Sequence, residues 1–270
     1  MRKIIVAAWA LMLFSSCLQA AEVFDRTAEV DKYVQLLQTA DFDTLEPAAK
    51  EIYASGIGDA RLAEAINARL LKDLPIFSNT SKLGYGHEKT RRVSQCMRYL
   101  VSALISTGHE EYRSTLTAIR NSHSEAAKVA KRAELENRDV DSVSWHRRKN
   151  EVMASTKNHH EGDDSNVSRL INLLQTDDYS YKYWAVDRMS WDKVLDPRLM
   201  RVIAAQTQEY VDRHGNEAFS MERRLMAYYV KMLGYSKDAQ YRGVLENLKG
   251  SNFIDARLSK AVNNALTKLN

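Results

Sequence analysis

Apolar side chains recur every three or four positions along most of this chain, which is the spacing of one face of an α-helix. The pattern is clear from Val30 to Leu37, from Leu45 to Ile52 and from Leu62 to Leu70. The alternation typical of strands is nearly absent, and the 270 residues include only 3 prolines and 10 glycines. We therefore predict an all-α protein.

The pattern divides into twelve predicted helices. A helix at 27–38 and a turn at 41–44 precede a second helix that ends before Gly56, and Pro75 is expected to end a third helix that starts at Asp59, with a loop as far as Lys89. The remaining helices are predicted near 90–107, 110–120, 124–137, 167–176, 180–192, 196–212, 219–233, 238–249 and 253–268. Short connections favour antiparallel neighbours, so we expect about six helical hairpins.

The chain contains an internal repeat. Residues 36–74 align with residues 173–211 without a gap, and 11 of the 39 aligned positions are identical, beginning with Leu-Leu-Gln-Thr in both copies. Tyr112-Arg113 and the residues after it match Tyr241-Arg242 in the same way. We therefore predict two duplicated halves, at 21–137 and 167–270.

One short motif opens three of the predicted helices. It reads Asp-Ala-Arg-Leu at 59–62, Asp-Pro-Arg-Leu at 196–199 and Asp-Ala-Arg-Leu at 255–258. An aspartate in this position caps free backbone N–H groups and favours the positive end of the helix dipole. Repeated use of one start signal is typical of stacked helical units.

The run 196–205 and the run from Asp255 to Leu266 resemble the HEAT-like α-solenoids, including the short-helix variety of the bilin lyases. The resemblance covers about two thirds of the chain after residue 20. It implies an elongated concave surface that binds a protein partner, and a fold that rarely holds catalytic residues. One departure is that the helix at 196 is third in its copy and the helix at 255 is sixth, so the register of the hairpins stays open.

Residues 138–166 interrupt the apolar pattern. This stretch is rich in charged and polar residues, from Trp145-His146-Arg147-Arg148-Lys149 to Asp163-Asp164. We predict a linker between the two halves that contains at most one short helix.

The first residues resemble an export signal. A cationic start at Arg2-Lys3 precedes an apolar run from Ile4 to Phe14 that is too short for a membrane anchor, and Ala20 offers a cleavage point. We expect residues 1–20 to be a signal peptide and the protein to be periplasmic. The alternative is a lipoprotein tethered to the membrane through Cys17.

Composition narrows the class of protein. With 44% hydrophobic residues the chain can bury a core, and without Arg2 and Lys3 it has 37 basic against 35 acidic residues, a net charge of +2. This near balance argues against a nucleic-acid partner. Without Cys17 only Cys96 remains, so no internal disulfide is expected, and its helical pattern predicts a buried thiol.

One helix of the second half carries an aromatic stripe. Tyr181, Trp184, Arg188 and Trp191 are spaced by three, four and three residues, whereas the first half has Thr44, Pro47, Glu51 and Ala54 at the equivalent positions. Because tyrosine, tryptophan and arginine are enriched in binding hot spots, we hypothesise that the stripe contacts a partner. The alternative is that it packs in the core.

A second cluster lies in the predicted linker. His159, His160, Glu161, Asp163 and Asp164 are metal-ligand types, although neighbouring histidines point to different sides of a helix and both ligate a metal only from a loop. The alternative is a solvated polar segment.

We find no glycine-rich phosphate loop, nucleophile elbow or paired carboxylate motif, and we expect neither an enzyme nor a bound cofactor. The sequence predicts a non-catalytic protein-binding or scaffold module of the bacterial envelope. The alternatives are a metal-handling protein that uses His159 and His160, and an accessory factor or lyase-type enzyme.

Overall fold

The computed structural model describes residues 23–81, 87–122, 142–213, 220–251 and 254–269. These residues form twelve α-helices and two short 3₁₀ helices. The first half contains α2 (Thr27–Thr39), α3 (Phe42–Ser55), α4 (Ala60–Ser81), α5 (Glu88–Ser106), η1 (Glu110–Tyr112) and α6 (Arg113–Ser122). The rest contains α8 (Ser142–Ala154), α9 (Ser165–Leu174), α10 (Tyr179–Asp192), α11 (Pro197–Arg213), α12 (Ser220–Ser236), η2 (Ala239–Tyr241), α13 (Arg242–Gly250) and α14 (Ala256–Lys268). The prediction of an all-α protein is therefore confirmed for the described residues.

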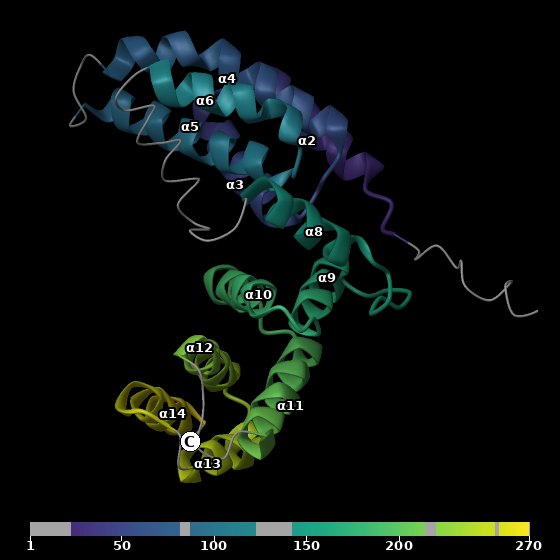
Figure 1. The fold of residues 1–270 in the computed structure, drawn as a ribbon, viewed down its shortest axis with the longest axis vertical. Helices are drawn as coiled ribbons and strands as arrows, with labels where there is room; N and C mark the ends of the chain where they lie inside the picture. Colours follow the sequence, from purple (N-terminus) through teal and green to yellow (C-terminus); the bar gives the residue numbers. More distant parts are fainter. Residues whose placement is uncertain (1–22, 82–86, 123–141, 214–219, 252–253, 270) are drawn as a thin grey trace, which may run out of the picture.

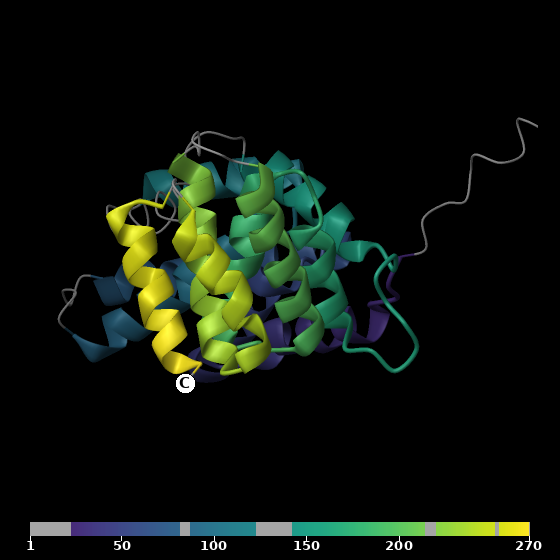
Figure 2. The same cartoon turned by 90° about the horizontal axis from the view of Figure 1, so that it is seen from below.

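The two groups of helices follow one another along the long axis of the molecule, and within each group the helices lie in two layers (Figure 1). In the first group α4 packs against α2 and α6 in one layer, and α3 packs against α5 in the other. In the second group α11 packs against α9 and α13 in one layer, and α12 packs against α10 and α14 in the other. Figure 2 shows the helices of the second half side by side when seen from below. Helices α11 and α14, which share the Asp-x-Arg-Leu start, lie in different layers.

Helix α8 joins the two halves. It contacts α5 on one side and α9 on the other, and Figure 1 shows it between the two groups of helices. Trp145 and Met153 of α8 belong to the core of the second half. On the other side, the Asn150 side-chain amide donates to the Ser106 carbonyl over 2.7 Å.

The turns that receive α8 are glycines for a steric reason. A Cβ on Gly56 would lie 2.5 Å from the Met153 sulfur, and one on Gly108 would lie 2.7 Å from the Arg147 Cα. Both glycines have positive φ, at 69° and 80°. Glycine therefore allows both the left-handed turn and the close approach of α8.

The same backbone features recur in both halves. Helix α3 begins and ends 137 residues before α10 (42 and 179, 55 and 192), and α4 begins 137 residues before α11. The left-handed residue after α3 is Gly56, and 137 positions later it is Lys193 with φ 55°. Likewise the left-handed Gly108 corresponds to Lys237 with φ 54°, at the separation of 129 residues that relates η1 to η2.

The aspartate start signals act as predicted. The Asp59 carboxylate accepts from the N–H of Arg61 and of Leu62. The Asp196 carboxylate accepts from the Arg198 N–H over 2.8 Å. The Asp255 carboxylate accepts from the Leu258 N–H, also over 2.8 Å. Each interaction satisfies a backbone donor that has no partner within its own helix.

The prediction that Pro75 ends the third helix is wrong. The helix that was expected to stop at Pro75 continues to Ser81 as α4. Beyond the proline, Phe77 is fully buried, and the Thr90 hydroxyl donates to the Thr80 carbonyl over 2.6 Å. These interactions stabilise the last turns and offset the loss of one backbone hydrogen bond at Pro75.

The predicted linker at 138–166 contains one helix, α8, at residues 142–154. The prediction allowed one short helix there, but not the buried face that this helix has, and residues 155–164 connect α8 to α9 as a loop. The buried side chains are Val143, Trp145, His146, Lys149, Asn150 and Met153. This part of the chain is therefore part of the packed structure rather than a solvated connection.

Some of the other predictions concern described residues, and some concern residues outside the described ranges. Cys96 is fully buried in α5, and burial raises the pKa of its thiol to about 12, so the expectation of a buried cysteine is confirmed. The expected signal peptide at 1–20, Cys17 and the helix at 124–137 lie outside the described residues. Among the described helices, none has the length and apolar character needed to cross a membrane.

The two lysines in the left-handed backbone conformation, Lys193 and Lys237, are positions where glycine should stabilise the protein. Replacing Lys193 or Lys237 by glycine should raise the free energy of unfolding by about 0.5–1 kcal/mol each, because a side chain with a Cβ is strained at positive φ. The measurement is urea unfolding followed by circular dichroism. Lys260→Gly, at an exposed position inside α14, is the control and should lower stability by about 1 kcal/mol. A loss of stability in all three variants would contradict the assigned turns.

Candidate functional site

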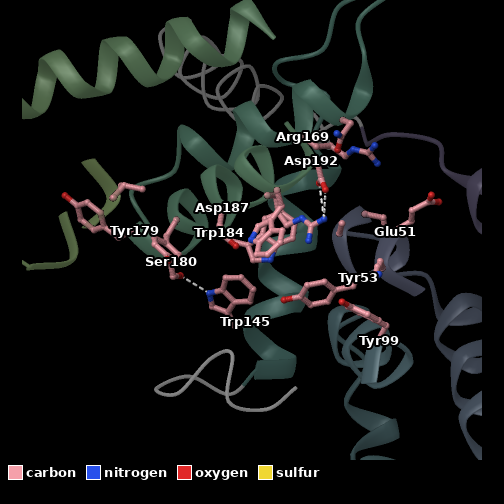
Figure 3. Close-up of a pocket in the computed structure, with 18 of the residues that line it drawn as sticks. Glu51, Tyr53, Tyr99, Trp145, Arg169, Tyr179, Ser180, Trp184, Asp187 and Asp192 are labelled. Carbon is pink, nitrogen blue, oxygen red and sulfur yellow. Dashed lines mark hydrogen bonds and ion pairs between the residues drawn. The ribbon is translucent and has the colours of Figure 1, made fainter. Parts of the chain in front are cut away.

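A hollow of about 1070 Å³ lies between the two halves. Its first wall comes from α2, α3 and α5, with Tyr33, Tyr53 and Tyr99. Its second wall comes from α10 and α12, and the aromatic residues there are Tyr179, Tyr183, Trp184 and Trp191. Trp145 of α8 completes the lining, so eight of the lining side chains are aromatic. Figure 3 shows Tyr53 and Tyr99 facing Trp184 and Trp145 across this space.

The lining also carries four basic and four acidic side chains, and many of them have partners. They are Lys50, Arg169, Arg188, Arg224, Glu29, Glu51, Asp187 and Asp192. Arg188 donates to both oxygens of Asp192, at 3.1 and 2.9 Å, as the dashed lines in Figure 3 show. Glu29 lies 3.8 Å from Arg169 and joins α2 to α9. The rim of the hollow is therefore polar and nearly balanced in charge.

Aromatic contacts hold the second wall in place. The Arg224 guanidinium donates to the Tyr183 hydroxyl over 2.8 Å and lies 4.8 Å from its ring. The Tyr183 and Tyr228 rings meet edge to face at 5.1 Å. Trp145 of α8 lies between the two walls and forms the floor of the hollow, and its indole N–H donates to the Ser180 hydroxyl over 2.8 Å. Contacts of this kind fix the orientation of the aromatic faces that line the hollow.

The predicted aromatic stripe is divided by the structure. Tyr181 is buried and packs on Trp145, with 5.3 Å between the ring centroids, and it does not line the hollow. The three other members do line it. Trp184 is half-buried, whereas Trp191 is 74% exposed at the rim. One end of the stripe thus belongs to the core, and the rest is available to a ligand.

The floor of the hollow covers a buried lysine. Lys149 of α8 is fully buried, and within the described residues its Nζ has neither a hydrogen-bond partner nor a carboxylate at ion-pair distance. The Nζ lies 4.1 Å from the Trp184 ring centroid and 5.7 Å from that of Trp145. Aromatic faces stabilise a cation only in part, by about 2 kcal/mol or more when it is desolvated.

Burial dominates the acid–base properties of this floor. Burial, and next the charge of Arg188, lower the pKa of Lys149 to about 7. Burial, and next the charge of Lys149, lower the pKa of His146 well below its ordinary value. Asp187, by contrast, has a raised pKa, mainly because it is half-buried. The environment disfavours charge on all three groups.

The histidines and carboxylates of the 159–164 loop have other partners. His159 packs edge to face on Phe24 at 4.9 Å and lies 3.2 Å from the Ser168 hydroxyl. Asp163 accepts from the His160 backbone N–H and pairs with Arg198, and Asp164 caps α9. Among the described residues no group of three or more His, Cys, Asp or Glu side chains is placed to hold a metal ion.

Sequence reasoning missed the floor and the opposite wall of the hollow. The sequence pattern places Lys149 and His146 in the predicted polar linker, and it gives no reason to select Tyr53 or Tyr99 as binding residues. A signal for the floor was present, because Trp145, Lys149 and Met153 are four residues apart and share one face of a helix. The wall residues carry no local signal.

No family model matches the chain, and no curated protein matches it. A search of solved structures finds a crystal structure of an engineered protein, from a structural genomics consortium, with 17% sequence identity. The match covers 89% of this chain and 96% of that chain, at a TM-score of 0.23. A similarity this low carries no argument about fold or function.

The buried lysine predicts a pH-dependent stability. The folded-state pKa of Lys149 lies below the unfolded value of 10.5, so the unfolded state binds more protons between pH 7 and 10.5, and stability should rise with pH. The contribution reaches about 1.4 kcal/mol per pH unit. Lys149→Met should remove this rise between pH 7 and 9 and stabilise the fold at pH 7 by about 1–3 kcal/mol.

Urea unfolding at several pH values measures both effects. Lys50→Met is the matched control, because Lys50 lines the hollow but is 43% exposed and pairs with Glu46. An unchanged pH dependence in Lys149→Met would show that this ammonium is not destabilised by burial.

Proposed function

We propose that this chain is a HEAT-like α-solenoid of two duplicated halves that binds a protein partner in the hollow and serves as a non-catalytic scaffold in the bacterial cell envelope. The observation that carries the binding role is the hollow of about 1070 Å³ with eight aromatic side chains on its lining. The partner is not a nucleic acid, in keeping with the near balance of charge.

The repeated geometry supports the proposal of duplication. Equivalent helices begin at constant separations, and left-handed residues recur at equivalent positions even where the second copy has lysine instead of glycine. A lysine is not preferred in that conformation, so its presence there is best explained by a backbone inherited from a common unit. The packing supports the solenoid arrangement in the same way, because within each half most helices pack against the next but one, as α3 does against α5 and α12 against α14.

The composition of the hollow supports a protein partner. Tyrosine, tryptophan and arginine dominate binding hot spots, since they bury much area with few rotatable bonds. Here they occur on both walls, and Trp191 exposes 74% of its surface without a covering element in the described structure. A flexible segment of another protein that enters the hollow would bury this surface.

The envelope location rests on the expected signal at residues 1–20, with periplasmic release or attachment through Cys17 as its two forms. A metal-handling role has no comparable support, because the side chains of His159, Asp163 and Asp164 have structural partners. No observation favours a lyase-type activity.

Alanine substitutions in the aromatic stripe should distinguish residues that bind the partner from residues that stabilise the fold. Trp191→Ala should reduce partner binding by about tenfold, in line with the loss of a hot-spot residue, and should change the free energy of unfolding by less than about 0.5 kcal/mol. Tyr181→Ala should instead destabilise the fold by roughly 3–5 kcal/mol, because Tyr181 is buried in the core.

Site-specific photocrosslinking in intact cells identifies the partner for these measurements. A photoreactive side chain at position 191 should capture one defined protein, whereas the same side chain at position 76, where Ile76 is 41% exposed on α4, should not. Equal capture at both positions, or binding that survives Trp191→Ala, would count against the hollow as the binding site.

A further inference from the structure

At the floor of the hollow and directly beneath it, several hydrogen-bond donors of the described residues have no acceptor. In the described structure the Lys149 Nζ, the Trp184 indole nitrogen and the Arg188 Nε are buried and have no partner. Buried polar groups are normally hydrogen-bonded, and buried charges are normally paired. Three such donors within one region are available to an acceptor that a ligand supplies.

These donors belong together in space. Trp184 and Arg188 are four residues apart on α10, so they lie on one face of that helix. The Lys149 ammonium lies 4.1 Å from the Trp184 ring centroid, and the charge of Arg188 acts on it directly. A ligand bound in this region would therefore be near two cationic side chains and an indole N–H.

The charges around this floor favour an anion rather than a neutral acceptor. Arg188 is the charged neighbour that acts on Lys149, and His146 beside it is held neutral by burial. The nearby Asp192 is already bound by Arg188 and is 48% exposed. Burial raises the pKa of Asp187, and the charge of Arg188 lowers it in part. Lys149 is thus a buried cation on this side of the hollow that has no carboxylate at ion-pair distance among the described residues.

We propose that the hollow recognises a carboxylate of the partner segment, either an acidic side chain or a C-terminal carboxylate, which binds at Lys149, Arg188 and the Trp184 indole N–H. This inference rests on the proposed function and names the chemistry that the partner must present. Trp184 lines the hollow and its ring lies 4.1 Å from the Lys149 ammonium, which does not itself line the hollow, so a carboxylate would have to displace the indole ring in order to contact Lys149. The aromatic walls then hold the residues that flank the carboxylate.

The first test observes Lys149 itself in the full chain labelled with ¹⁵N-lysine. Saturating acetate should raise the pKa of the Lys149 ammonium by at least one unit, which corresponds to at least tenfold tighter acetate binding when the amine is protonated. Lys50, which already pairs with Glu46, serves as the internal control and should not respond. If acetate leaves the Lys149 titration unchanged, the carboxylate site is overturned.

The second test uses synthetic ten-residue peptides of random sequence, made with a free C-terminal carboxylate and with an amide. Peptides that the wild-type chain retains should lose at least tenfold in affinity when their carboxylate is removed. Amidation removes a C-terminal carboxylate, and Glu→Gln removes the carboxylate of an acidic side chain. Lys149→Met should weaken only the carboxylate forms, by about tenfold. Lys260→Met, at an exposed position of α14 outside the lining of the hollow, is the control and should change the affinity less than twofold.

The outcomes separate this inference from the proposed function. Peptides that bind equally in charged and neutral forms, but lose affinity with Trp191→Ala, would overturn the carboxylate site and leave the protein-binding role intact. A response of Lys149 to acetate without any peptide binding would support the anion site and count against the protein-binding role. Tighter binding of inorganic phosphate than of acetate would overturn the peptide assignment.

Discussion

The packing of α8 between the two halves is the constraint on which the rest of the structure depends. One face of this helix closes on Gly56 and Gly108, where any side chain would collide with it, and its Trp145 and Met153 enter the core of the second half. Interiors are close-packed, so a helix clamped on two sides fixes the distance between the groups that it touches. The width of the hollow is therefore set by α8 and not by the walls themselves.

Local signals allowed much of the fold to be predicted from the sequence. Apolar spacing and aspartate caps act within one or two turns, and they placed most helices of the described part near their observed bounds. Pro75 misled the prediction because its effect on the backbone is local, whereas the burial of Phe77 that sustains α4 depends on the tertiary structure. The burial of α8 could not be predicted because its buried face includes His146, Lys149 and Asn150, so the apolar period is interrupted.

The candidate site could be predicted only where one helix carries it. Trp184, Arg188 and Trp191 were found because they repeat at helical spacing on α10, but that spacing does not say where the stripe enters the core, and Tyr181 lies on the buried side. Tyr53 and Tyr99 face the stripe, although each of them is more than eighty residues away from Trp184 in the sequence. Only the placement of the two halves by α8 brings these residues together, and no local pattern encodes it.

The buried ammonium connects this architecture to the binding role. A fold that holds Lys149 without a counter-charge gives up stability, because burial disfavours the charged form. A ligand that supplies an anion would restore that stability, and by linkage it would bind the folded protein more tightly for the same reason. Since Lys149 lies on the helix that sets the width of the hollow, the binding of an anion and the alignment of the two aromatic walls would stabilise each other. An apolar residue at this position would avoid the cost of burying an ammonium, so the proposed recognition of an anion offers a reason for the lysine that packing alone does not.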